Sequence, residues 1–142
     1  MFLRGLLGIV FMVLAIPALS QTWLTGTTAS YHFDRNDYEE ENWGIGIERP
    51  FYEKVRGVAG VYRNSFSKTS IYVGGVYSPF TFGPAAVGVM GGLFTGYGDG
   101  FQLVIAPVLS VEGKTIGANL LYVPPYGDHR GLVALQLKWK LD

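Results

Sequence analysis

The chain has 142 residues, equal numbers of acidic and basic side chains, and no cysteine. The length suits one domain, the zero net charge gives no indication of nucleic-acid binding, and the absence of cysteine excludes disulfides and thiolate chemistry. Charged residues make up only 15% of the chain, whereas a soluble surface usually needs roughly 25–35%. The composition therefore favours a protein whose surface meets something other than water.

The N-terminus has the pattern of a secretory signal. Met1–Arg4 carries a positive charge, Gly5–Ala18 is apolar, and Ala18-Leu19-Ser20 places small residues before a cleavage site. We predict that residues 1–20 are a signal peptide cleaved before Gln21 and that residues 21–142 form the mature domain. The alternative is a membrane-anchoring helix, but the apolar run is shorter than the ~20 residues that span a bilayer.

Short segments of alternating polarity follow the signal and are separated by turn residues. The clearest is 101–111, in which Phe101, Leu103 and Ile105 share one face while Gln102 and Ala106 share the other. In the last segment the lysines fall opposite the leucines, which predicts that they face a lumen or a rim. We predict eight strands, at 22–33, 42–49, 55–64, 68–78, 85–97, 101–111, 114–123 and 130–141.

This pattern predicts an all-β fold, an eight-stranded antiparallel transmembrane β-barrel of a Gram-negative outer membrane. A closed barrel satisfies the backbone polar groups in lipid and leaves no open edge. We expect a monomer with membrane lipids, phospholipid and lipopolysaccharide, as partners. A lipocalin-like secreted barrel would show the same alternation with its apolar face inside, and the low charge content favours the membrane barrel.

With both termini periplasmic, the loops of one end should face outward. These outer loops are expected near 34–41, 65–67, 97–100 and 124–129, and the inner turns near 50–54, 79–84 and 112–113. The acidic tract 34–41 is expected to be a solvated loop; binding of divalent cations is the alternative. We predict no metal site and no cofactor.

Candidate chemistry falls near the predicted outer rim. His32 ends the first strand, Asn64 and Ser65 follow the third, and His129 lies in the last outer loop. A serine needs a base to act as a nucleophile, and histidine is the usual one. The alternative is that these are ordinary hydrogen-bonding groups of the rim.

Three segments resemble the PagP family of lipid A palmitoyltransferases. They are Tyr38–Ile47, which is similar to the stretch after that family's catalytic histidine, Tyr62–Lys68, which is similar to its Asp-Ser segment, and Tyr122–Pro124, which is similar to its end. The resemblance implies transfer of an acyl chain from a phospholipid to lipid A at the outer rim. It does not extend to the amphipathic helix that precedes the family's first strand.

The resemblance also implies roles for individual residues. His32 matches the catalytic histidine and Ser65 the serine, whereas Asn64 stands where the family has Asp. An amide cannot carry the charge of a carboxylate, so Asn64 would act as an oxyanion or orienting donor. Asp34 or Asp37 is the alternative source of a carboxylate.

Further positions implied by the resemblance concern the lipid path. Counted without gaps from the serine, the family's lumen-floor glycine falls on Val76, which with Gly88 is assigned to the acyl pocket. A valine there predicts a chain shorter than palmitate. Pro50, Pro107 and Pro124 resemble prolines that open lateral lipid gates, and the alternative is a bulge at Pro107 with ordinary turns at the others. A non-catalytic barrel that is structural, lipid-binding or phage-borne also remains open.

Overall fold

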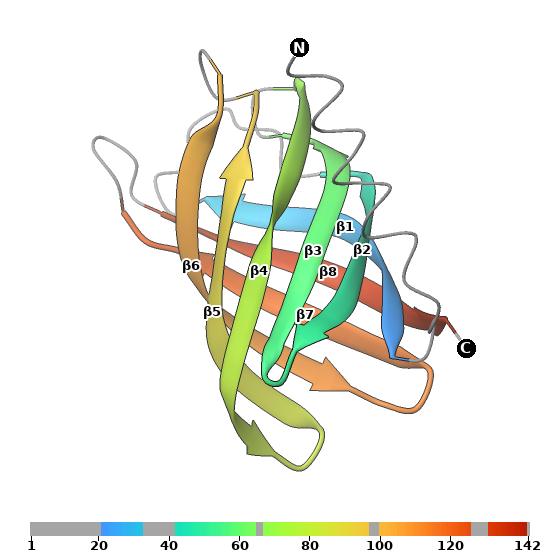
Figure 1. The fold of residues 1–142 in the computed structure, drawn as a ribbon. Coiled ribbons are helices and arrows are strands. Elements are labelled where there is room, and N and C mark those ends of the chain that lie inside the picture. The colour runs from blue at the N-terminus through green and yellow to red at the C-terminus, as the bar shows by residue number, and fades with distance from the viewer. Residues whose placement is uncertain (1–20, 33–41, 65–66, 97–99, 126–130, 142) are drawn as a thin grey trace.

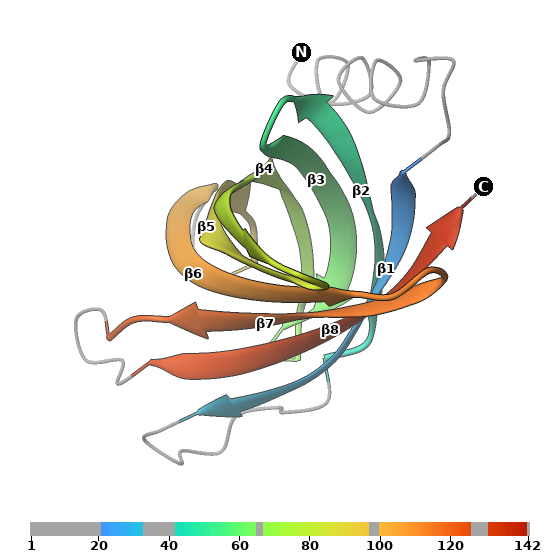
Figure 2. The same cartoon turned by 90° about the horizontal axis from the view of Figure 1, so that it is seen from below.

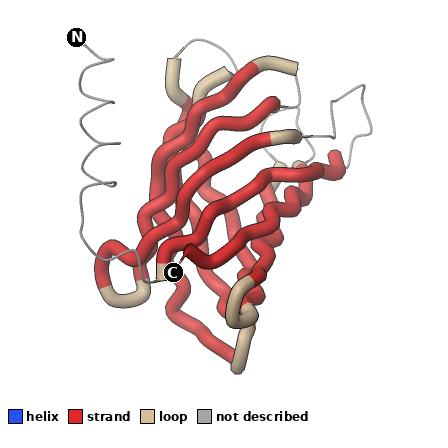
Figure 3. Tube along the Cα trace, turned by 90° about the vertical axis from the view of Figure 1, so that its right-hand side faces the viewer, coloured by secondary structure: helices blue, strands red, loops and turns tan. Residues whose placement is uncertain are grey.

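The computed structural model describes residues 21–32, 42–64, 67–96, 100–125 and 131–141. In these residues the chain forms eight antiparallel strands that close into one barrel (Figure 1), and strands make up most of the trace (Figure 3). They are β1 (Thr22–His32), β2 (Gly44–Tyr52), β3 (Val55–Arg63), β4 (Thr69–Phe82), β5 (Ala85–Phe94), β6 (Gln102–Glu112), β7 (Ile116–Val123) and β8 (Leu132–Leu141). The all-β, eight-stranded antiparallel barrel predicted from the sequence is confirmed. Among the described residues no helix is long and apolar enough to cross a membrane.

The alternation assigns the faces of the strands as predicted. Leu103 and Ile105 of β6 point outward and are 69% and 59% exposed, whereas Ala106, on the opposite face of the strand, is 1% exposed. On β8 the side chain of Lys138 is 0% exposed. The exterior therefore carries large apolar side chains, and the interior holds the charged side chains together with other apolar ones.

The turn predicted at 79–84 is wrong in extent, because β4 continues through Pro79 to Phe82. The β3–β4 register ends at Val55↔Tyr77, so the last residues of β4 pair only with β5. The β4–β5 register also shifts between Tyr77 and Phe80. Proline has no N–H to donate, and an edge with an irregularity is a position where a strand tolerates it.

The end predicted for the second strand at Arg49 is also wrong, because β2 runs through Pro50 to Tyr52. Arg63 donates its N–H to the Trp43 carbonyl, just before β2. Because hydrogen-bonded positions alternate along an antiparallel ladder, the odd-numbered residues of β2 direct their N–H and C=O groups at β3 and the even-numbered ones at β1. The N–H that Pro50 lacks would face β1 beyond the Trp23↔Glu48 pair, where the β1–β2 register ends. The strand therefore loses no ladder bond there.

Two of the eight ladders are much shorter than the others. The described register joins β1 to β2 through three residue pairs and β6 to β7 through five, whereas β1 and β8 are joined through ten. The barrel consequently consists of a three-strand unit, β7–β8–β1, and a five-strand unit, β2–β6. Figure 2 shows β7 and β8 running across the open side of the curved β3–β6 wall. We call the two short ladders the seams.

Four charged side chains fill the lumen toward the end that carries the 53–54, 83–84 and 113–115 turns. The Lys138 Nζ lies 3.2 Å from Glu48 Oε1 and 3.4 Å from Glu112 Oε1, and Arg56 Nη1 lies 2.9 and 2.6 Å from the same two oxygens. Two cations thus face two carboxylates, and we call these residues the charge quartet. Lys138 belongs to β8 in the three-strand unit, whereas Glu48 belongs to β2 and Glu112 to β6, the two edge strands of the five-strand unit. The ion pairs of Lys138 therefore join the three-strand unit to both edges of the five-strand unit.

We expect Lys138→Met to destabilise the barrel by about 3–5 kcal/mol, because it leaves two carboxylates in the lumen facing one cation. The measurement is the unfolding midpoint in urea of the refolded protein, followed by heat modifiability on gels. Lys140→Met, on the same strand but partly exposed, is the matched control and should change stability by well under half as much. Equal stability of Lys138→Met and wild type would show that the quartet does not hold the units together.

Candidate functional site

A cavity of about 900 Å³ occupies the lumen toward the other end of the barrel. Its volume is at the upper end of the ~300–1,000 Å³ typical of small-molecule pockets. Every strand except β2 contributes to its lining in the described residues, and most of the lining side chains are apolar. The buried part includes Val58, Val76, Met90 and Val108, which pack on one another.

Three aromatic rings form the wall of the cavity on β3, β4 and β5. The rings of Tyr72 and Phe94 stack with centroids 5.5 Å apart, and Tyr62 meets Tyr72 edge-on at 5.9 Å. A Cβ added to Gly60 would come within 2.6 Å of the Tyr72 hydroxyl and 2.7 Å of its ring carbons. Glycine on β3 therefore makes room for the ring.

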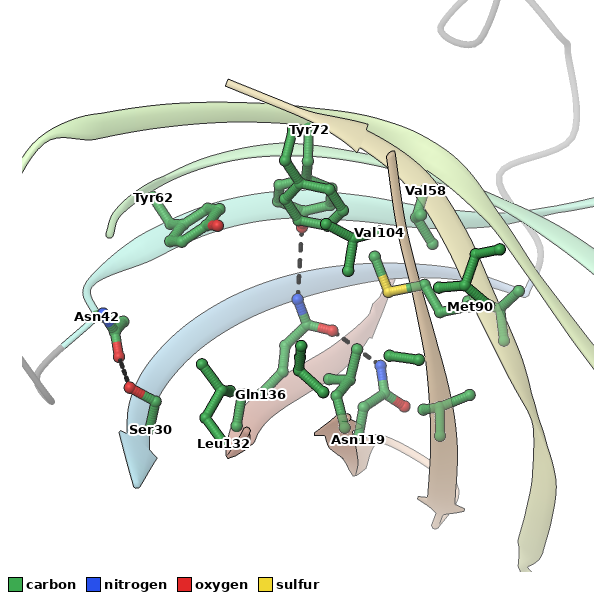
Figure 4. Close-up of a pocket in the computed structure, with 18 of the residues that line it drawn as sticks. Ser30, Asn42, Val58, Tyr62, Tyr72, Met90, Val104, Asn119, Leu132 and Gln136 are labelled. Carbon is green, nitrogen blue, oxygen red and sulfur yellow. Dashed lines mark hydrogen bonds between the residues drawn. The ribbon is translucent and has the colours of Figure 1, made fainter. Parts of the chain in front are cut away.

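A row of polar side chains crosses the lumen at the cavity (Figure 4). The Asn119 Nδ2 on β7 donates to Gln136 Oε1 on β8 at 2.8 Å, and Gln136 Nε2 donates to the Tyr72 hydroxyl on β4 at 3.4 Å. We call Tyr72, Gln136 and Asn119 the polar bar. Asn119 also donates to Glu48 Oε2 at 3.1 Å and accepts from Ser110 at 2.7 Å, so the bar is anchored to the charge quartet.

The cavity reaches the outside of the barrel along the β6–β7 seam. Leu103 and Ile105, which point outward, line it together with the inward-facing Val104 and Ala106. The β6–β7 register runs only from Val108↔Leu121 to Glu112↔Gly117. Within the described chain, the part of β6 before Val108 has no ladder partner on β7, and this separation gives the cavity a lateral mouth.

Pro107 stands at the residue where β6 and β7 separate. Glu112 donates its N–H to the carbonyl of Pro84 and Gly113 donates to Ile116, so the odd residues of β6 face β7. The N–H that Pro107 lacks would therefore point at β7, one residue beyond the last pair. The β5–β6 register passes Pro107 without a shift in the residues described, which argues against a bulge there.

The other two prolines assigned to gates lie in different places. Pro124 follows β7 and lines the cavity beside the same mouth. Pro50 lies toward the turn end, far along β2 from the cavity rim. The geometry thus groups Pro107 with Pro124 and separates Pro50 from them.

Of the two residues assigned to the acyl pocket, Val76 is 5% exposed and lines the cavity. Gly88 is not among the described lining residues. A Cβ on Gly88 would collide with the Tyr77 carbonyl and lie 2.7 Å from Ser78 Cα. The backbone of β4 passes close to Gly88 at the irregularity near Pro79, so only a glycine fits there.

At the rim, Asn42 connects the ends of β1 and β3. It accepts a hydrogen bond of 2.5 Å from the Ser30 hydroxyl and donates one of 3.0 Å to the Arg63 carbonyl. Ser30 lies two residues before His32, and Arg63 lies two residues before Ser65. The side chain of His32 and the whole of Ser65 lie outside the described residues, as do His129, Asp34 and Asp37. The sequence analysis missed Asn42, whose only signal was an amide at the start of a predicted strand.

Asn64 is fully buried just after β3. Its Nδ2 donates to Ser70 Oγ at 2.9 Å and to the Gly96 carbonyl at 2.8 Å, and its Oδ1 accepts from the Lys68 N–H at 3.1 Å. The amide therefore joins the ends of β3, β4 and β5. Both of its N–H groups are engaged in these contacts, so the described geometry does not present them to a developing oxyanion.

No known family model matches the sequence, and no curated protein matches it. Within the described residues, no group of three or more His, Cys, Asp or Glu side chains is arranged to hold a metal ion.

We expect Asn64→Asp to lower stability rather than restore a catalytic carboxylate. The new oxygen would face the Gly96 carbonyl where an N–H now donates, and a buried unpaired acceptor costs about 1–3 kcal/mol before charge is counted. The measurement is the urea midpoint beside Asn64→Ala, which loses the same bonds without adding a charge and should cost less. An aspartate variant as stable as wild type would contradict the structural role of the amide.

Proposed function

We propose that this protein is an outer-membrane barrel that takes the acyl chain of a membrane lipid into its lumen and transfers it to lipid A at the outer rim. The observation that carries the proposal is the mostly apolar cavity with a lateral mouth at the β6–β7 seam. A chain that entered sideways would leave its headgroup in the membrane interface. This is the access that a lipid needs and a water-soluble ligand does not.

The distribution of polarity supports a membrane-embedded barrel over a lipocalin-like one. Large apolar side chains such as Leu103, Ile105 and Leu93 are exposed on the exterior, whereas the two largest fully buried side chains are those of Lys138 and Glu48. A soluble barrel has the opposite arrangement. Exposed aromatics at the turn end, among them Phe51, Tyr52 and Phe82, fit an interfacial girdle.

The placement of the β1 and β3 ends supports chemistry at the rim. Asn42 ties them together within two residues of the positions of His32 and Ser65. In the proposed reaction His32 accepts the proton of a lipid A hydroxyl while that oxygen attacks the ester carbonyl of the phospholipid. The ester bond breaks, and the lysophospholipid leaves with the proton. Ser65 is the positioning hydroxyl or, in a two-step version, the first nucleophile.

One observation favours a second candidate, a barrel that binds lipid without consuming it. The residue in the position of the family's aspartate, Asn64, is committed to joining three strands. If no other carboxylate orients His32, the cavity binds a lipid and no acyl transfer takes place.

The experiment that separates these functions is a mass spectrum of lipid A. A Gram-negative strain without its own rim acyltransferase expresses wild type, Ser65→Ala or His32→Ala. We expect wild type to add one acyl group, with a mass below that of palmitoyl because of Val76, and both variants to lose at least ~90% of the product, in line with the ~10²-fold typical contribution of a general base.

If lipid A stays unmodified although the folded barrel is present in the outer membrane, the transferase function is overturned and the lipid-binding function is supported. An added palmitoyl group would keep the transferase and overturn the chain-length expectation for Val76. Recovery of the folded protein in a soluble periplasmic fraction would overturn the membrane assignment.

We expect Pro107→Ala to narrow the lateral mouth, because it supplies a backbone donor facing β7 at the first unpaired position. One ladder bond is worth about 1 kcal/mol, which corresponds to about a fivefold slower entry of a fluorescent fatty acid in reconstituted vesicles. Pro79→Ala, on the edge of β4, is the control and should leave the entry rate unchanged. Equal rates for wild type and Pro107→Ala would mean that the seam is not the entry path.

A further inference from the structure

The polar bar is an unexpected feature of a cavity that otherwise suits a hydrocarbon. Tyr72 and Asn119 are 5% and 4% exposed, and both line the cavity together with Gln136. Figure 4 shows Gln136 reaching across the lumen between them. A plain alkyl end that filled the cavity would lie against these groups and shield them from water without offering them a hydrogen bond.

The contacts behind the bar fix which way its amides point. The Glu48 carboxylate can only accept, so Asn119 must turn its Nδ2 toward it, and the Ser110 hydroxyl meets the Asn119 oxygen. Asn119 then donates to Gln136 Oε1, which leaves Gln136 Nε2 directed at the Tyr72 hydroxyl. The charge quartet thus sets the orientation of an N–H donor within the cavity.

The contact between Gln136 and Tyr72 is the loosest in this row. It measures 3.4 Å, whereas N–H···O bonds are typically about 2.7–3.2 Å and the Asn119 to Gln136 bond is 2.8 Å. An amide donor and a phenol hydroxyl side by side match a group that accepts one hydrogen bond and donates another. A hydroxyl does both, and a methyl group does neither.

We propose that the cavity selects an acyl chain that carries a hydroxyl group at its inner end, held by Gln136 Nε2 and the Tyr72 hydroxyl. This inference rests on the proposed function and names its ligand class. The apolar lining of the cavity surrounds the methylene chain, and the polar bar recognises its hydroxyl. A hydroxylated chain is then preferred over the alkyl chain of the same length.

The test compares lauric acid with ω-hydroxylauric acid as competitors of a fluorescent fatty acid on the full mature barrel in lipid nanodiscs. Partition into the lipid differs between the two acids but is the same for every protein variant, so the readout is the ratio of their affinities across variants. We expect Gln136→Leu and Tyr72→Phe to shift the ratio toward lauric acid by about threefold to tenfold each, the effect of one hydrogen bond.

Leu121→Val, which changes only the apolar lining, is the control and should lower both affinities without moving their ratio. Tyr72→Phe keeps the ring and removes one oxygen, so the affinity ratio can still be measured with this variant if Gln136→Leu does not fold. An unchanged ratio in both polar-bar variants, with both acids bound, overturns the inference and leaves the proposed function standing. Failure of both acids to bind wild type overturns the two together.

Discussion

The position of Lys138 between two carboxylates is the interaction on which the rest of this barrel depends. Its strand belongs to the three-strand unit, and Glu48 and Glu112 belong to the two edges of the five-strand unit. The seams themselves hold few ladder bonds, so the ion pairs carry much of the closure from inside. Because buried charges are costly unless they are paired and hydrogen-bonded, the same cluster excludes the alternative packings of this lumen that would separate them.

The quartet also determines where the barrel is filled and where it is hollow. Four long charged side chains occupy the turn end, with Asn119 bonded to Glu48 and Ser110 bonded to Asn119, and an eight-stranded barrel has little further room there. Toward the rim most of the lining side chains are apolar residues and aromatic rings, crossed by the polar bar. The described residues thus form a pocket that is filled at the turn end and open along the β6–β7 seam.

Much of the fold could be predicted from the sequence, because period-two alternation assigns each side chain a face, as it did for Lys138 and Ala106. The strand ends at Arg49 and Ser78 were mispredicted, since the proline that follows each of them looks the same in a turn and on a strand edge that has no ladder bond to lose. The seams and the polar bar could not be predicted, because they depend on register and on contacts such as Lys138 to Glu48, which are 90 residues apart. At the rim, nothing local marked Asn64 as a residue that joins three strands.

The unequal ladders have a consequence for how the ring closes during folding. Bringing the first and last strands together involves the largest loss of chain entropy, because nearly the whole sequence lies between them. That ladder is among the longest, with ten pairs, whereas the sequence neighbours β1 and β2 share three. One of the longest ladders therefore joins the two strands whose pairing is slowest to form. We infer that the β1–β8 ladder is the main lock of the closed ring, and that the short β1–β2 pairing is the most easily reversed.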